Sequence, residues 1–225
     1  MKSLKDKKRI IIIVITGILI LAAGIYCKQQ FFLMIPLFIS LFVMAFQSEA
    51  NRIGALMGAI NSLIYTAAYI YMGVYASAAS SFLFSFPIQL MTFFSWKKNA
   101  YKNTAIFKSM TKKTRILLSS LLVVVWIAMI CIFKSLDYEY ALLDSISFLL
   151  GFVTPVLTML AYIEYTYLWI IQGVVGIFLS VQMTIVDYRQ LTYLIYSVYC
   201  CYCVILAFIS VRKFYKEQQE TAAVK

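Results

Sequence analysis

Repeated uncharged stretches, separated by short polar breaks, constrain this chain more than any other feature. A helix needs about 20 apolar residues to cross the hydrocarbon layer of a membrane, and the chain offers run after run of that order. Of its 225 residues, 63% are hydrophobic and only 13% are charged, which is far more apolar material than one water-soluble core of this size requires. The sequence therefore predicts an all-α integral membrane protein.

The polar breaks divide the chain into eight predicted transmembrane helices. The first apolar run, 10–26, follows a basic segment but lacks a small-residue cleavage pattern, so it is expected to be a real span and not a signal peptide. The second run, 31–47, is short and contains Pro36, which is tolerated only if neighbouring helices satisfy the carbonyl group that proline leaves free. The breaks fall at 27–30, 48–52, 73–75, 97–114, 134–140, 162–165, 187–189 and from 212 onward.

Basic residues are concentrated in three blocks, 1–9, 97–114 and 212–225, and the net charge is +11. Short cytoplasmic loops of membrane proteins are enriched in Lys and Arg. Eight alternating helices with both termini in the cytoplasm place all three blocks inside, whereas seven helices would not. Because the basic residues lie between apolar runs and not along an amphipathic face, no nucleic-acid partner is expected.

Loop order suggests an internal repeat. Segments 73–86 and 186–199 align weakly, and short, short and long connections follow one another in both halves. A single helix between two triplets makes the halves run in the same direction, with a binding site at their interface. We expect an extra helix with the N-terminus (1–29), a first three-helix bundle (30–96), a basic loop (97–114), a linker helix (115–134), a second three-helix bundle (141–211) and a cytoplasmic tail (212–225).

Polar and aromatic side chains form narrow stripes at helical spacing on several of these predicted helices. One interpretation is structural: small residues let helices approach each other, and Tyr or Trp lie in belts at the membrane interface. We favour it for the aromatic residues near helix ends, which are Trp96, Tyr162, Tyr165, Tyr167 and Tyr188. A shared polar cavity is the other, favoured for the carboxamides because each costs a few kcal/mol if buried without a partner. The stripe residues that we place in a substrate site are Asn61, Tyr65, Gln89, Thr92, Phe93, Thr166, Trp169, Gln172, Tyr196 and Tyr199.

The chain offers little for chemistry inside a membrane. It has no His, and neither Lys nor an acid lies at the centre of a predicted span, so acid–base, nucleophilic and metal chemistry are not expected. Cys200, Cys201 and Cys203 have no ligand partner nearby and are interpreted as packing residues. No phosphate-binding loop is present, and no cofactor is expected. Passive movement of a solute is therefore favoured over an enzyme.

Three segments, "SFPIQLMTFFSWKKN" (85–99), "LDS" (143–145) and "YIEYTYLWIIQGVVGIFLSVQM" (162–183), resemble the PnuC family of vitamin transporters, best known for nicotinamide riboside. The similarity spans roughly 49–215. It implies a fold akin to the SWEET sugar carriers, a homotrimer, and facilitated diffusion followed by phosphorylation by a cytoplasmic kinase. Gln89 matches the family glutamine and Trp169 the second Trp of a Trp-x-x-Trp-x-x-Asn/Asp pattern. Two positions depart from this pattern: Thr166 stands where the family has the first Trp, and Gln172 stands where it has Asn or Asp. A third departure is Thr92, at a position of the fourth helix where the family usually has Gly.

The resulting prediction is a transporter of the bacterial inner membrane that carries a flat heterocycle such as nicotinamide riboside, thiamine, riboflavin or a deoxynucleoside. Trp169 would stack on the base, Gln89 and Gln172 would bind its edge, and Asn61 would bind hydroxyl groups. Tyrosines of the third and eighth helices would close the pathway. An alternative is a vitamin-binding subunit that needs a partner for transport and docks through the basic loop. A structural membrane protein is disfavoured by the carboxamides.

Overall fold

The computed structural model describes residues 2–71, 73, 75–135 and 141–223, and they are predominantly helical. The fourth predicted span is made of three consecutive helical segments. The predicted break at 134–140 lies largely outside the described residues. The elements are α1 (Lys2–Tyr26), α2 (Phe31–Ser48), α3 (Arg52–Tyr71), α4 (Tyr75–Ser80), the π turn η1 (Ser81–Ser85), α5 (Phe86–Lys98), β1 (Ala100–Tyr101), β2 (Thr104–Ala105), α6 (Lys112–Ser135), α7 (Ala141–Met159), α8 (Tyr165–Val186), the 3-10 turn η2 (Tyr188–Gln190) and α9 (Leu191–Ala223).

Apolar side chains cover the outside of the bundle, as expected for a protein surrounded by lipid. Within the described residues, six helices are long and apolar enough to cross a membrane, while the apolar parts of α2 and α7 are shorter. None of the described side chains of α6 is buried, and the apolar side chains of Leu117 and Val124 are both more than 60% exposed. The chain is an integral membrane protein, and the count of eight crossings stays a prediction.

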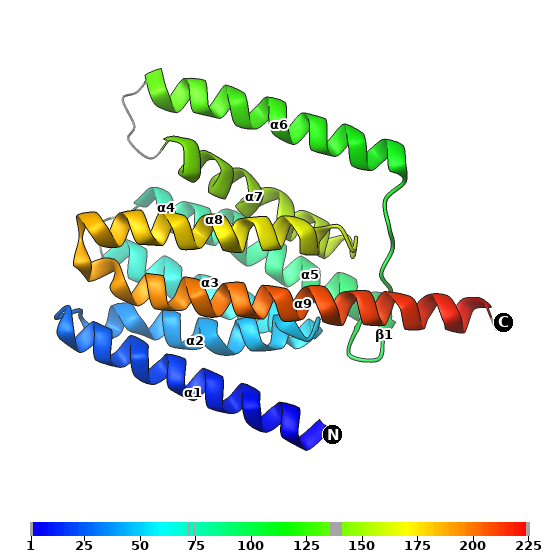
Figure 1. The fold of residues 1–225 in the computed structure, drawn as a ribbon, viewed down its shortest axis with the longest axis horizontal. Helices are drawn as coiled ribbons and strands as arrows, with labels where there is room; N and C mark the ends of the chain where they lie inside the picture. Colours follow the sequence, from blue (N-terminus) through cyan, green and yellow to red (C-terminus); the bar gives the residue numbers. More distant parts are fainter. Residues whose placement is uncertain (1, 72, 74, 136–140, 224–225) are drawn as a thin grey trace.

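The helices form two groups of three that meet along two contacts (Figure 1). In the first group α3 packs against both α2 and α5, and in the second group α8 packs against both α7 and α9. The groups touch where α2 meets α9 and where α5 meets α7. The first helix of each group thus contacts the last helix of the other, which is the pattern that two equivalent groups would produce.

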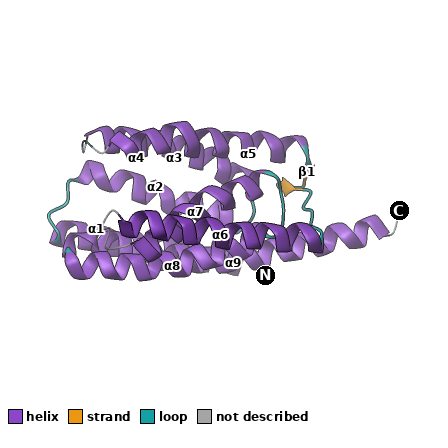
Figure 2. Cartoon of the chain, turned by 90° about the horizontal axis from the view of Figure 1, so that it is seen from above, coloured by secondary structure: helices purple, strands orange, loops and turns teal. Residues whose placement is uncertain are grey.

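Two helices lie outside these groups. The linker helix α6 packs mainly on α7, and the N-terminal helix α1 packs on α9 and α2 (Figure 1). Arg9 of α1 forms an ion pair with Glu49, directly after α2. Both termini and the β1–β2 hairpin lie toward the same end of the bundle, seen also from above in Figure 2. We call this end the basic end, since all three basic blocks are found there.

The basic end is more ordered than the sequence predicts. The 97–114 segment was expected to be a loop, yet it contains the β1–β2 hairpin, and Gln218 holds that hairpin by donating to the Ala105 carbonyl and accepting from the Phe107 N–H, each at 2.9 Å. Gln218 can do so because α9 continues to Ala223 instead of ending near Val211. Good helix-forming residues and i,i+4 charge pairs favour that extension.

The span from α4 to α5 contains the main irregularity of the described helices. Its π turn, Ser81–Ser85, is closed by the Phe86 N–H, which donates to the Ser81 carbonyl five residues earlier. Pro87 follows immediately and has no N–H with which to continue a regular helical pattern. The wider turn therefore lies just before the proline and sets the rotation at which α5 faces the second group of helices.

Candidate functional site

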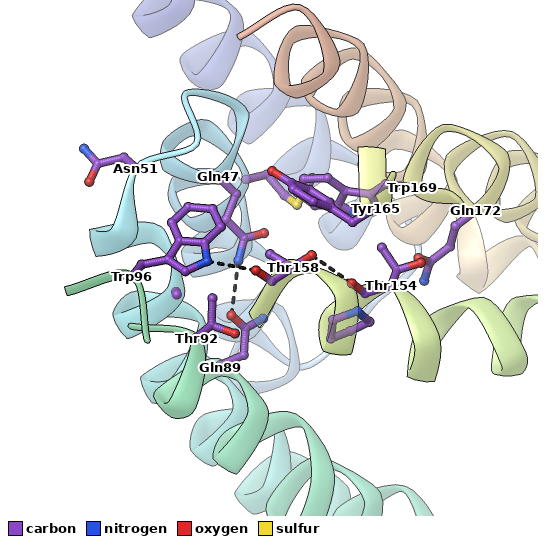
Figure 3. Close-up of a pocket in the computed structure, with 13 residues that line it drawn as sticks. Gln47, Asn51, Gln89, Thr92, Trp96, Thr154, Thr158, Tyr165, Trp169 and Gln172 are labelled. Atoms are coloured by element: carbon purple, nitrogen blue, oxygen red, sulfur yellow. Dashed lines mark hydrogen bonds between the residues drawn. The ribbon is translucent and has the colours of Figure 1, made fainter. Parts of the chain in front are cut away.

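A cavity of about 170 Å³ lies where the two helix groups meet. It is formed by α5, the C-terminal halves of α2 and α7 and the N-terminal halves of α3 and α8 (Figure 3). The cavity therefore lies toward the basic end. We call it the central cavity. Its lining residues are Met44, Gln47, Asn51, Ala55, Gln89, Thr92, Trp96, Thr154, Pro155, Thr158, Tyr165, Trp169 and Gln172.

Helix α8 contributes an aromatic pair and an amide. Tyr165, Trp169 and Gln172 are spaced four and three residues apart, which puts them on one face of a helix. The Tyr165 and Trp169 rings lie 5.9 Å apart, tilted at 49°. Among the described residues, neither the Trp169 indole nor the Gln172 carboxamide has a hydrogen-bond partner. Both groups are thus available to a ligand.

Helix α5 contributes Gln89, Thr92 and Trp96, again at helical spacing. The Trp96 indole N–H donates to the Thr158 carbonyl of α7 at 2.8 Å, which ties the two helix groups together (Figure 3). The Thr92 hydroxyl donates to the carbonyl of Ile88. These two side chains shape the wall, while Gln89 keeps most of its hydrogen-bonding capacity.

Two carboxamides face each other across the first helix group. Gln47 of α2 donates to the Gln89 Oε1 at 3.4 Å, a long contact that a ligand can replace (Figure 3). Gly58 of α3 makes room for Gln89, since a Cβ at this position would lie 2.9 Å from the Gln89 carboxamide. The absence of a side chain at Gly58 therefore permits the present orientation of Gln89.

Helix α7 contributes a buried hydroxyl without a partner. Thr154 is 3% exposed, and its Oγ1 has no hydrogen bond within the described part of the chain. Its carbonyl accepts from the Thr158 hydroxyl at 2.8 Å. An unpaired buried hydroxyl costs about 1–3 kcal/mol, so a bound molecule that pairs with Thr154 recovers this loss.

Among the residues that the structure describes, no charged side chain lines the central cavity. Charged groups instead line a neighbouring cavity of about 510 Å³ at the basic end, which includes Asn51 among its lining residues and which we call the vestibule. There Lys102 pairs with Glu217 at 2.9 Å, and this hydrogen bond raises the pKa of the Lys102 ammonium. The chain thus separates an uncharged binding cavity from a charged surface opening.

The structure brings four of the ten predicted site residues together. Gln89, Thr92, Trp169 and Gln172 line the central cavity, whereas the other six do not. Those six have the following surroundings: Asn61 donates to Ser40 at 2.7 Å, Tyr65 lies 3.4 Å from the same hydroxyl, Tyr196 packs against the buried cluster that contains Ile20 and Leu41, Tyr199 donates to the Leu41 carbonyl, Thr166 donates to the Ile163 carbonyl, and the Phe93 ring contacts Phe94.

Nine of the thirteen lining residues were not among the predicted site residues, and these nine include Gln47, Trp96, Thr154 and Tyr165. Trp96 and Tyr165 were interpreted as interfacial, but they are 4% and 1% exposed, so that interpretation is wrong for both. Thr154 lies at helical spacing from Ser147 and Thr158 on α7, so the spacing that identified the other polar stripes is the signal that could have found it. Asp144, part of one resemblance motif, has a side chain outside the described residues.

Known proteins share both the sequence pattern and the fold. A model of the family described as nicotinamide mononucleotide transporter matches residues 30–213. A structure titled "Crystal structure of the Vitamin B3 transporter PnuC" superposes with a TM-score of 0.74 at 18% identity, over 93% of this chain and 91% of that chain. No curated protein sequence matches the chain significantly. Because the family model covers most of its length, the chain belongs to the nicotinamide mononucleotide transporter (PnuC) family.

Proposed function

We propose that this membrane transporter imports an unphosphorylated, flat heterocyclic vitamin or nucleoside by facilitated diffusion. The observation that carries the proposal is a central cavity that has an aromatic face, the unpaired carboxamide of Gln172 and, within the described part of the chain, no charged side chain. Candidate substrates are nicotinamide riboside, thiamine, riboflavin and deoxynucleosides. Trapping by a cytoplasmic kinase would then keep the imported compound inside.

The cavity chemistry assigns a role to each available group. Trp169 would stack on the heterocycle, with the ring of Tyr165 beside it; this arrangement also suits a cationic ring. Gln89 and Gln172 would bind the hydrogen-bonding edge, and Thr154 would pair with a hydroxyl.

A phosphate does not suit this cavity. Burying an ionised group without a partner is strongly unfavourable, and Lys, Arg and His are all missing from the lining. The name of the matching family refers to a mononucleotide, which carries a phosphate group. For this chain we therefore favour the dephosphorylated nucleoside as the transported species.

Further parts of the proposal concern assembly and location. We infer a homotrimer in the bacterial inner membrane with both termini in the cytoplasm. The exposed apolar surface of α6 is compatible with lipid or with a neighbouring protomer, and the basic end carries the charge bias of a cytoplasmic face. Light scattering of the purified protein measures the number of protomers.

Ligand-dependent thermal unfolding of the purified protein tests substrate identity. A compound that binds only the folded state raises stability, by about 2.7 kcal/mol at 100 times its Kd. Nicotinamide riboside, its mononucleotide, thiamine, riboflavin and deoxynucleosides form the panel. A shift with the mononucleotide alone would contradict the proposal.

Uptake by proteoliposomes then separates transport from binding. We expect equilibration of the substrate without ATP or an ion gradient, and accumulation only when a kinase and ATP are enclosed. Binding without uptake would instead support a binding subunit that needs a partner.

The Trp169→Ala variant should lose at least about tenfold in affinity, because stacking contributes about 0.5–1.5 kcal/mol beyond the loss of buried aromatic area. Trp126→Ala is the control, since Trp126 lies on α6 and bonds to Ser145, away from the cavity. The measurement is the ligand concentration that half-saturates the thermal shift. Equal affinities for the two variants would remove Trp169 from the site.

A further inference from the structure

A second cavity of about 170 Å³ shares Trp169 and Gln172 with the central cavity. Its other described lining residues come from the second helix group, and none of these described residues is charged. We call it the transit cavity. Its lining is Ser147 of α7, Trp169, Gln172, Gly173 and Gly176 of α8, and Ser197, Cys200 and Val204 of α9.

The transit cavity extends away from the basic end. Along α8 the central cavity begins at Tyr165, whereas the transit cavity continues to Gly176. A helix rises about 1.5 Å per residue, so Gly176 lies about 16 Å beyond Tyr165 along the axis. The vestibule, which shares Asn51 with the central cavity, lies on the other side. The three cavities therefore follow one another through the bundle, joined by residues that they share.

Gly176 indicates that this space is kept open. A Cβ at Gly176 would meet no atom within 4 Å, while one at Gly173 would meet the Cys201 Cα at 3.5 Å. Gly176 thus serves no close helix contact and has no positive φ that would require glycine. A glycine inside a helix costs about 1 kcal/mol relative to alanine. Open volume for a passing molecule explains why the chain bears this cost.

We propose that the transit cavity is a second binding position for the same unphosphorylated heterocycle, occupied on the way to or from the central cavity. Trp169 and Gln172 border both positions, so a substrate can keep stacking and edge contacts while it moves between them. Ser147 and Cys200 add weak polar contacts, and Ser197 is already paired with Ser180 at 2.7 Å. This inference rests on the proposed transport function and adds the route to it.

The test compares two leucine substitutions on α8. Gly176→Leu places a side chain in the transit cavity, while Val174→Leu adds bulk on the outward face, where Val174 is 42% exposed. We expect Gly176→Leu to keep the ligand-induced thermal shift, because the central cavity is unchanged, and to lose at least about tenfold in the initial rate of uptake. Val174→Leu should keep both, and Gly176→Ala should be intermediate in rate.

The outcomes separate this inference from the transport proposal. Binding and uptake at normal levels in Gly176→Leu would overturn the transit cavity and leave the proposed function intact. The absence of any thermal shift in the unmodified protein would contradict the proposed function itself.

If Gly176→Leu does not fold, Ser147→Cys in a background free of other cysteines replaces it. A small thiol-specific methanethiosulfonate should then block uptake, and substrate should protect the cysteine. Labelling without loss of uptake would overturn the inference.

Discussion

At the scale of single residues, we expect substrate binding to depend on side chains whose hydrogen-bonding groups are not used within the protein. Gln172, Trp169 and Thr154 have groups without partners in the described structure, and Gln89 has only the long contact with Gln47. The stripes of α5 and α8 predicted the amides because helical spacing alone places them on one face. Helical spacing also places Thr154 with Ser147 and Thr158 on one face of α7, but only the packed structure reveals that its hydroxyl lacks a hydrogen-bond partner.

Gly58→Ala should displace Gln89. The new Cβ would lie 2.9 Å from the Gln89 carboxamide, so this side chain must rotate and its bond to substrate is lost or weakened. Losing a hydrogen bond of about 1–1.5 kcal/mol raises the KM of uptake about tenfold. Gly17→Ala is the matched control, because its Cβ would lie 3.7 Å from Leu41, an ordinary contact. A KM equal to that of the control would show that Gln89 does not bind substrate.

Thr154→Val should separate stability from affinity. Valine has nearly the same shape, and the Thr154 hydroxyl has no partner to lose, so thermal stability without ligand should stay equal or increase. Affinity for substrate should fall about three- to tenfold, since the hydroxyl becomes paired only when a ligand binds. Thr66→Val, on α3 away from the cavity, serves as control. A stability loss with unchanged affinity would contradict this role.

At the scale of elements, the cavity depends on links between helices that are distant in sequence. Trp96 joins α5 to α7, and Glu164, which is 8% exposed, holds the segment before α6 against the start of α8. Its Oε1 accepts from the Met110 N–H at 3.0 Å, from Ser109 at 3.0 Å and from Arg115 at 2.8 Å. Helix positions were predictable from apolar runs, but these links were not, because each joins two elements that no periodicity in the sequence connects.

Glu164→Ala should loosen the segment between the hairpin and α6. The buried Met110 N–H loses its acceptor, which costs about 1–3 kcal/mol of stability. Glu164→Gln keeps an acceptor oxygen and should lose less. Hydrogen exchange at 106–111 is the measurement, with the exposed Glu220→Gln as control. Unchanged exchange in Glu164→Ala would show that the hairpin and Gln218 suffice to hold this segment.

At the scale of the whole molecule, charge and packing agree on one orientation. Three basic blocks, both termini and the vestibule lie at one end, and the two helix groups meet through corresponding contacts. The concentration of basic residues in three blocks is visible in the sequence, and the cytoplasmic orientation that it implies stays a prediction. The weak repeat predicted two helix groups but not the cavity at their interface in detail, because side-chain direction there depends on the irregular backbone of α2, α7 and the α4–α5 span.

Reporter fusions at the C-terminus test this orientation. A fluorescent protein fused after residue 225 should fluoresce, because it folds in the cytoplasm, and alkaline phosphatase fused there should be inactive. The same fusions after residue 73, between α3 and α4, should give the opposite result. Equal signals at both positions would contradict the proposed topology.

The π turn at Ser81–Ser85 has a consequence for how this gene can change over generations. A π turn closes over five residues where an α turn closes over four, so a codon lost in this turn is absorbed by a regular α turn that keeps the downstream register. A codon lost just after it, before Gln89, would instead rotate Gln89, Thr92 and Trp96 together by about 100° and out of the cavity, although none of them had mutated. Lineages that retain the substrate should therefore vary in length within the turn and not in the helix that follows it.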